Sequence, residues 1–482
     1  MLKEKIKSTV IILLIINMFF ITTQLWFVQS YSTTGEYLMD YMRSIPLINN
    51  FIPADEEYSV PKENLSLPRK FLINDGSLWT VYYNTDIGFS PIEQRTRSII
   101  LGFLKGDITA KKEIDNLTWE AGLESLSIYV EYPISFSMEM FCRIMGVDAT
   151  DVPGDIKNIH DFVILPSSDE TQVCLLLRDY SDDPIYYAYI LSNKYQFPAE
   201  DLEVYTSSNE ERCEPAFSTG LLLDEENSVS LSPLVLFSDS QPENTVLYPS
   251  TLVNDNSKEL LLENFAFNYQ TVNCYESNDG TENFIENYGS IKFYPDNIFE
   301  YSSVSEDKGI VLDESGNAFN ALNSAIDFAE KTWRCVSNEQ FNVLVTSDLS
   351  NYDSEKPYTF KFNYYYNGCP VEIDIDANYG HDKMRCSIEA TLLRGKLISY
   401  RQYLCSYNSA SDLQISDDFL TALDSFINTI SADVESNTVI NDIYIGYLDD
   451  GKSDKLQARW LAKINGSNKV YRYSSKEEVI SQ

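Results

Sequence analysis

The sequence predicts an α+β protein in which one N-terminal transmembrane helix precedes a multidomain extracellular region of antiparallel sheets, each covered by helices. Three observations lead to this prediction: a predominantly apolar run without charges at Val10–Val28, many short alternating segments typical of strands, and a strand-and-helix pattern that occurs twice in the C-terminal half. The expected segments are an anchor at 1–30, a stalk at 31–70, and α+β domains at 71–258, 259–350 and 351–482.

The apolar run has the length of a membrane-spanning helix. No charge occurs between Ser8 and Gly35, and at about 1.5 Å per residue the run spans roughly 28 Å, close to the hydrocarbon thickness of a bilayer. Lysines precede the run, which predicts a cytoplasmic N-terminus and an extracellular bulk. A cleaved signal peptide is the alternative, although its apolar core is usually shorter and no good cleavage site follows. The expected membrane-interface residues are Lys3, Lys5, Lys7 and Trp26.

Two polar residues inside the run, Asn17 and Gln24, lie seven positions apart and therefore on nearly one face of a helix. Polar groups in lipid favour a partner helix that can form hydrogen bonds with them. These two residues are the candidate partner-binding positions in the membrane. Alternatively, Gln24 lies near the headgroups and Asn17 is tolerated.

The composition restricts the partners of the remaining chain. The 482 residues carry a formal net charge of −37, and such a surface repels nucleic acid, so no nucleic-acid partner is expected. The 33 tyrosines and 25 phenylalanines argue for packed cores rather than disorder.

Apolar spacing predicts the elements of the first α+β domain. A strand is expected at 78–83, and a helix is expected after the Ser90-Pro91 capping pattern, with Ile92, Ile99 and Phe103 on one face. Further strands are expected at 126–131, 162–165, 173–178 and 185–191, with a helix at 137–145. A polar segment follows, and a domain boundary is expected near residue 258.

The C-terminal half contains an internal repeat. Phe265–Tyr269 recurs as Phe360–Tyr364, and a helical pattern near Ala321 recurs near Ala422. Each copy is expected to form strands followed by one amphipathic helix that covers the sheet. Turns are expected at Asp296-Asn297 and Arg394-Gly395.

Catalytic signatures are lacking in the sequence. The two histidines, His160 and His381, have no metal-ligand spacing or nucleophile motif around them, and we expect both to be structural or exposed. The eight cysteines include no C-x-x-C pair; small buried side chains are expected, with a Cys386–Cys405 bridge as the alternative. We therefore expect no enzyme activity, no cofactor and no metal.

One group of acids keeps a catalytic alternative open. Glu372, Asp374 and Asp376 alternate with isoleucines and would share one face of a strand. They would bind Ca²⁺ or supply the carboxylate pair of a glycosidase, or else form a solvated strand face. Asp449-Asp450-Gly451 lacks EF-hand spacing and is interpreted as a surface turn.

The order of several short motifs, together with the Lys-rich tail and anchor, resembles the YycH (WalH) family. These motifs are Ser127–Pro133 leading to Met145, Phe267–Tyr269, Tyr288–Ile291, Ile298–Tyr301, and the closing segment from Arg459-Trp460 to Tyr471–Tyr473. The closing segment is also similar to the C-terminal hairpin of the sister family YycI and of PepSY-like domains. The resemblance therefore implies two related C-terminal units of this kind.

The resemblance also implies a function. Members of the family are single-pass membrane regulators of the WalK–WalR (YycG–YycF) two-component system, which controls cell-wall homeostasis in Gram-positive bacteria. The implied partners are a sensor histidine kinase and a YycI-like sister protein in the cell membrane, contacted without catalysis. Two alternatives remain open: an extracytoplasmic module that binds wall polymer or peptide, and a carboxylate-dependent wall hydrolase.

Overall fold

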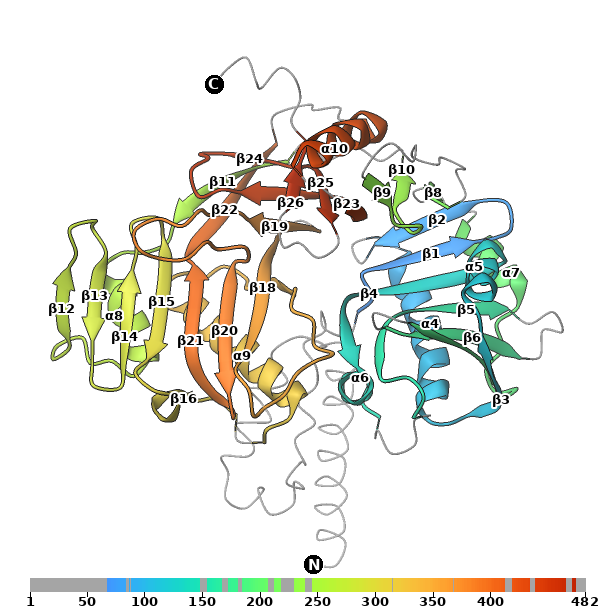
Figure 1. The fold of residues 1–482 in the computed structure, drawn as a ribbon, viewed down its shortest axis with the longest axis horizontal. Coiled ribbons are helices and arrows are strands. Elements are labelled where there is room, and N and C mark those ends of the chain that lie inside the picture. The colour runs from blue at the N-terminus through green and yellow to red at the C-terminus, as the bar shows by residue number, and fades with distance from the viewer. Residues whose placement is uncertain are drawn as a thin grey trace, which may run out of the picture. The chain divides into compact units, whose positions relative to one another are not determined.

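The computed structural model contains two large β-sheet regions with helices packed on them (Figure 1). It describes residues 67–83, 86, 88–147, 154–166, 172–180, 184–206, 212–217, 229–238, 245–313, 315–366, 368–411, 418–433, 438–464 and 470–473. All of them belong to one of the two compact units of the chain, Val60–Gln482. The described helices are α4 (Phe89–Leu104), α5 (Asn116–Glu124), α6 (Met138–Ile144), α7 (Ala199–Thr206), α8 (Asp255–Asn264), α9 (Ala318–Arg334) and α10 (Phe419–Asp433).

The first sheet has seven strands in the order β2-β1-β4-β5-β6-β7-β3, all antiparallel. Their bounds are β1 (Lys70–Asn74), β2 (Trp79–Tyr83), β3 (Ile108–Ile114), β4 (Ser127–Ser137), β5 (Asn158–Pro166), β6 (Val173–Asp179) and β7 (Ile185–Leu191). Five of the expected elements, the strands at 78–83, 162–165, 173–178 and 185–191 and the helix at 137–145, are therefore confirmed. The strand expected at 126–131 is also present but extends further, to Ser137.

Both faces of this sheet are buried, because helices pack on either side. Phe71 and Ile73 belong to the same core cluster as α4, whereas Leu72 points to the opposite face and packs with Trp119 and Leu123 of α5. Successive side chains of a strand alternate between faces, so a strand covered on both sides is apolar throughout. This explains the continuous apolar sequence Phe71–Ile73 within β1, a strand that the sequence analysis did not predict.

The second sheet runs in the order β12-β13-β14-β15-β21-β20-β18-β19-β23-β25-β26, and three short strands pair beside this path (Figure 1). Its bounds are β9 (Val229–Leu231), β12 (Asn273–Glu276), β13 (Glu282–Ile285), β14 (Gly289–Phe293), β15 (Ile298–Ser303), β16 (Ile310–Val311), β17 (Val343–Val345), β18 (Tyr358–Tyr366), β19 (Cys369–Ile373), β20 (Ile388–Leu393), β21 (Lys396–Tyr403), β23 (Thr438–Asp449), β25 (Arg459–Ile464) and β26 (Val470–Arg472). Small ladders add β8 (Cys213–Pro215) with β10 (Leu236–Ser238), and β11 (Thr245–Thr251) with β22 (Cys405–Ser411) and β24 (Leu456–Gln457).

Helices cover this sheet in two separate places. Helix α9 packs through Phe328 on Phe265 and on Tyr400 of β21, with ring centroids 4.9 and 5.7 Å apart. Helix α10 instead packs in a distinct core cluster with Val229 of β9 and Trp460 of β25. Both expected helices are confirmed, and both expected turns are present: Asn297, Arg394 and Gly395 have positive φ angles.

Several local expectations are corrected. Phe265–Tyr269 is not a strand, because it follows α8 as its C-terminal turn, whereas Phe360–Tyr364 lies in β18. Helix α4 begins at Phe89 with Gly88 as N-cap, so Ser90 is not the cap. The sheet is not wholly antiparallel: β23 pairs in parallel with β19 and with β9, because long crossovers connect these strands.

The division of the chain into five segments and the duplication within its C-terminal half remain predictions. The ladder between β15 and β21 joins 259–350 to 351–482, and residue 258 lies within α8. The anchor at 1–30 and the stalk up to residue 66 lie outside the described residues. Among the described helices, none is long and apolar enough to cross a membrane.

Candidate functional site

A ladder of alternating charges crosses the face of the second sheet opposite α9. Lys292 of β14 lies opposite Glu300 of β15, Glu300 opposite Arg401 of β21, and Arg401 opposite Glu389 of β20. Lys292 Nζ lies 3.3 Å from Glu300 Oε1, and Arg401 Nη1 lies 3.1 Å from Glu389 Oε2. Opposite charges on directly paired residues stabilise neighbouring strands.

The β19–β20 loop (residues 374–387) is fastened over this ladder. Ile375 and Met384 pair through two backbone hydrogen bonds of 3.1 and 2.9 Å, which makes the loop a small hairpin. At its tip, Tyr379 and Gly380 both have positive φ, and His381 N donates to Asn378 O at 2.9 Å. These angles define a type I′ turn, which presents the His381 ring to the sheet.

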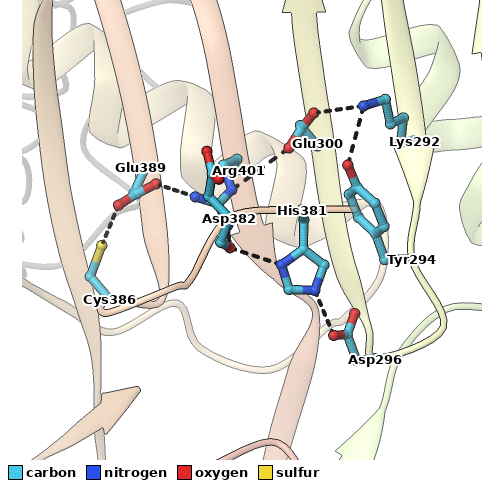
Figure 2. A network of polar contacts seen from close by, with 9 residues as sticks. All are labelled: Lys292, Tyr294, Asp296, Glu300, His381, Asp382, Cys386, Glu389 and Arg401. Atoms are coloured by element: carbon cyan, nitrogen blue, oxygen red, sulfur yellow. Dashed lines mark hydrogen bonds and ion pairs between the residues drawn. The ribbon is translucent and has the colours of Figure 1, made fainter. Parts of the chain in front are cut away.

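His381 connects the loop to the β14–β15 turn (Figure 2). Its Nε2 lies 2.7 Å from Asp296 Oδ2, and its Nδ1 lies 2.8 Å from the carbonyl oxygen of Asp382. Its ring packs edge-on against Tyr294 at 4.9 Å. Arg401 Nη2 donates to the same Asp382 carbonyl at 2.6 Å, so the charge ladder also holds the loop.

The electrostatics of this network follow from burial and charge pairing. Burial lowers the pKa of Lys292, but the Glu300 carboxylate and the Tyr294 hydroxyl together outweigh burial and raise that pKa above the ordinary value. Burial and then the Glu300 charge raise the pKa of Tyr294. Burial, with the neighbouring Glu389 carboxylate, raises the pKa of the Cys386 thiol well above its usual value, so that cysteine is an unreactive thiol.

Glu372 is buried, which corrects the expectation of a solvated strand face. Only 3% of the residue is exposed. Its carboxylate accepts hydrogen bonds from Asn363 Nδ2 and Tyr444 OH and forms an ion pair with Lys463 Nζ, each at 2.6 Å. Burial and then the Glu372 charge raise the pKa of Tyr444 well above its ordinary value. The arrangement joins β18, β19, β23 and β25, which makes Glu372 a structural group.

The other acids singled out in the sequence are paired or lie in turns. Asp374 lies beside Arg385, and Asp376 Oδ1 lies 3.1 Å from Lys383 Nζ. Asp449 Oδ1 and Asp450 Oδ1 accept backbone hydrogen bonds of the following turn. Burial raises the pKa of Asp449, which also accepts from Tyr407 OH at 2.9 Å. A turn does follow at Asp450-Gly451, but Asp449 is fully buried at the end of β23, so the interpretation of Asp449-Asp450-Gly451 as a surface turn holds only in part.

The remaining candidates are placed as follows. His160 lies on β5 and packs against Tyr180 at 4.8 Å, far in sequence from His381 and without a shared network in the described residues. The eight cysteines lie in the described part of the chain and form no disulfide there, Cys386 and Cys405 included. The described ranges contain no cluster of metal-binding side chains. Asn17, Gln24, Lys3, Lys5, Lys7 and Trp26 lie outside the described residues.

A second ion-pair cluster, which sequence reasoning missed, joins the two sheets. Arg69, just before β1, pairs with Asp442 of β23 and lies 3.5 Å from Glu131 of β4, while Lys70 Nζ lies 3.2 Å from Glu131. The Arg69 guanidinium also lies 5.4 Å from the ring centre of Tyr444. These residues are far apart in the chain, so no local sequence pattern predicts the cluster.

A cavity of about 410 Å³ opens between the end of α9, the segment leading to β17, and strands β18 and β22. Its aromatic wall includes Trp333, Tyr364 and Tyr407, and these three residues are only 5–6% exposed. These three rings therefore belong to the core beneath the cavity, where they offer little surface for stacking on a ligand.

Together, these features define a strand-rich α+β protein in which many buried polar groups, such as Glu372, are held in structural ion pairs and hydrogen bonds. Among solved structures, the chain is similar to YycH from Bacillus subtilis, with a TM-score of 0.53, 12% identity, and coverage of 85% of this chain and 97% of that chain. The chain therefore has a YycH-like fold, which confirms the resemblance seen in the sequence motifs.

A second solved structure, an uncharacterized protein from Eubacterium rectale, matches with a TM-score of 0.31 and 13% identity, covering 49% of this chain and 86% of that chain. No family model and no curated protein matches the sequence.

Proposed function

We propose that this chain is a membrane-anchored extracytoplasmic regulator of a sensor histidine kinase of the WalK type, acting through protein–protein contacts and without catalysis. The YycH-like fold, which extends over most of the chain, is the observation that carries the proposal. The charge-free run at Val10–Val28 supports the anchor. Glu372 accepts a hydrogen bond from Tyr444, and Asp374 and Asp376 form ion pairs with neighbouring cations. These contacts make a carboxylate-dependent hydrolase the less favoured alternative.

The physical requirement on such a regulator is differential binding. It shifts a kinase between signalling states only if it binds the two states with different affinities, since equal affinity shifts nothing. Anchoring both proteins in one membrane raises their effective concentration, so modest contacts suffice. A YycI-like sister protein is the second partner in this proposal.

The orientation of the anchor is testable. The lysines before Val10 and the charge-free run predict a cytoplasmic N-terminus and an external acidic region. Protease added to intact protoplasts is expected to digest the acidic region, while an N-terminal epitope stays protected. Full protection of the acidic region would refute this orientation.

Partner binding within the membrane is tested with the double variant Asn17→Leu/Gln24→Leu. An interhelical hydrogen bond contributes on the order of 0.5–2 kcal/mol, so kinase recovery from solubilised membranes should fall roughly 2- to 30-fold. Membrane insertion should persist, because both changes raise apolarity. The readout is co-purification quantified by mass spectrometry.

An anchor swap is the matched control. Replacing the whole run with an unrelated membrane helix should reduce recovery at least as much as the double variant. Unchanged recovery with the swapped anchor would place recognition in the extracellular region. Absence of a kinase from the wild-type preparation would contradict the proposed function itself.

A further inference from the structure

The cavity at the end of α9 has a rim that the protein itself holds in place. Trp333 Nε1 donates a hydrogen bond to the carbonyl oxygen of Glu339 at 3.2 Å, and Glu339 N donates to Ser337 Oγ at 3.1 Å. Further along, Tyr365 N of β18 donates to the carbonyl oxygen of Asn342 at 3.0 Å. The segment between α9 and β17 is therefore fastened at both ends, and little of it has to be ordered when a ligand binds.

The rim carries side-chain amides whose hydrogen-bonding capacity the protein does not use. Gln340 and Asn342 belong to the segment between α9 and β17, and Asn408 belongs to β22, which is distant in the chain. Within the ranges that the structure describes, none of these three amides forms a side-chain hydrogen bond. An amide offers two donor hydrogens and one acceptor oxygen. The rim therefore suits groups that both donate and accept, as hydroxyl groups do.

The charges around the cavity disfavour an anionic ligand. Among the described residues that line the cavity there is no lysine, arginine or histidine, and Glu339 is the one carboxylate. A phosphate or carboxylate group would find no cation to pair with and would be repelled by Glu339. The net charge of −37 on the whole chain adds to this repulsion. The cavity therefore favours a ligand without negative charge.

The rings and the size of the cavity fit a small ligand with apolar faces. Phe341 and Tyr366 line the cavity and are half-buried, unlike the buried rings of Trp333, Tyr364 and Tyr407. A sugar ring carries C–H groups on its faces, which pack on aromatic surface, and hydroxyl groups around its edge. The volume of about 410 Å³ lies within the range of small-molecule sites, about 300–1,000 Å³.

We propose that this cavity binds a neutral mono- or disaccharide, whose hydroxyl groups form hydrogen bonds with Gln340, Asn342 and Asn408. The amides come from two segments far apart in the chain. They therefore surround a compact ligand and do not follow one extended peptide. This site goes beyond the proposed function and does not rest on it, because sugar binding requires no kinase.

The test is titration calorimetry, together with saturation-transfer NMR, on the full chain in micelles of a detergent without a sugar head group. The probes are cellobiose, maltose and diacetylchitobiose, which are neutral disaccharides. At least one of them should bind with a dissociation constant in the millimolar range or below. Cellobiuronic acid, which differs from cellobiose by one carboxylate, should bind more weakly than cellobiose. Tri-alanine with blocked ends, a neutral peptide, should not bind.

Matched variants connect the binding to the rim. Gln340→Leu and Asn408→Leu each remove one amide while nearly keeping the side-chain size, and both positions are exposed, so the fold should persist. The loss of one hydrogen bond should weaken sugar binding roughly 2- to 10-fold in each variant. Asn273→Leu changes an exposed asparagine on β12, away from the cavity, and should bind like the wild type.

The carbohydrate site is overturned if none of the three sugars binds, or if both rim variants bind as the wild type does. Tighter binding in Asn408→Leu would show a preference for apolar ligands and would overturn it as well. So would binding of the blocked tri-alanine without sugar binding, or equal binding of cellobiuronic acid and cellobiose. Failure to recover a kinase while sugar binding persists contradicts the proposed function alone.

Discussion

Replacing Gly395 with alanine is expected to destabilise the protein by roughly 4 kcal/mol, because it combines backbone strain with the loss of hydrogen bonds. Gly395 has φ of +72°, and an added Cβ would overlap the carbonyl oxygen of Asp313. Its own carbonyl accepts hydrogen bonds from Leu312 N and Asp313 N at 2.9 and 3.0 Å. Moving the backbone to relieve the overlap would break both bonds and shift the β20–β21 turn.

Gly146→Ala is the matched control. Gly146 has nearly the same φ, +71°, but no atom of the described residues lies within 4 Å of an added Cβ. It should therefore cost only the left-handed strain, about 1–2 kcal/mol. Chemical denaturation of both variants measures the difference. Equal losses would show that the segment around Asp313 does not pack on the turn as described.

Replacing Lys463 with methionine is expected to cost roughly 2–4 kcal/mol, because it leaves the buried Glu372 carboxylate without its cation. The range is set below that of a fully buried pair because the Lys463 side chain is 40% exposed, whereas that of Glu372 is 4% exposed. Tyr444 and Asn363 still donate to the carboxylate, but neither neutralises its charge.

The partner variant separates charge from packing. Adding Glu372→Gln to Lys463→Met should recover part of the loss, since a neutral amide needs no cation. Lys383→Met, which removes an exposed partner of Asp376, should cost less than about 1 kcal/mol. If Lys463→Met costs no more than Lys383→Met, the Glu372 carboxylate is fully stabilised by its neutral donors. The free energy of unfolding at neutral pH is the measured quantity.

Local sequence patterns correctly predicted those helices and turns whose geometry depends on residues close together in the chain. The helical spacing of Ile92, Ile99 and Phe103 predicted α4, and the turn residues Arg394-Gly395 predicted a two-residue connection between β20 and β21. The missing nucleophile and metal motifs led to the non-catalytic interpretation. Helical spacing and turn residues involve only neighbouring positions in the chain, so they can be recognised without knowledge of the fold.

The same local reasoning failed where residues distant in the sequence determine the secondary structure or the burial of a segment. Phe265–Tyr269 matches the β18 sequence Phe360–Tyr364, yet it ends α8, because Phe265 packs beneath α9 against Phe328. Glu372 alternates like a solvated position, yet it is buried because Tyr444 and Lys463 of other strands enclose it. Alternation specifies two faces of a strand but not what covers each face.

By itself, then, the sequence determined the α+β class, many of the individual strands and helices, and a set of motifs whose order matches a YycH-like fold. Only the tertiary structure decided the strand order, the charge ladder, and the pairing of His381 with Asp296 and of Arg69 with Asp442. The physical reason is that these contacts join residues distant in the chain. Strand register brings them together, and register depends on the packing of the whole sheet rather than on any local segment.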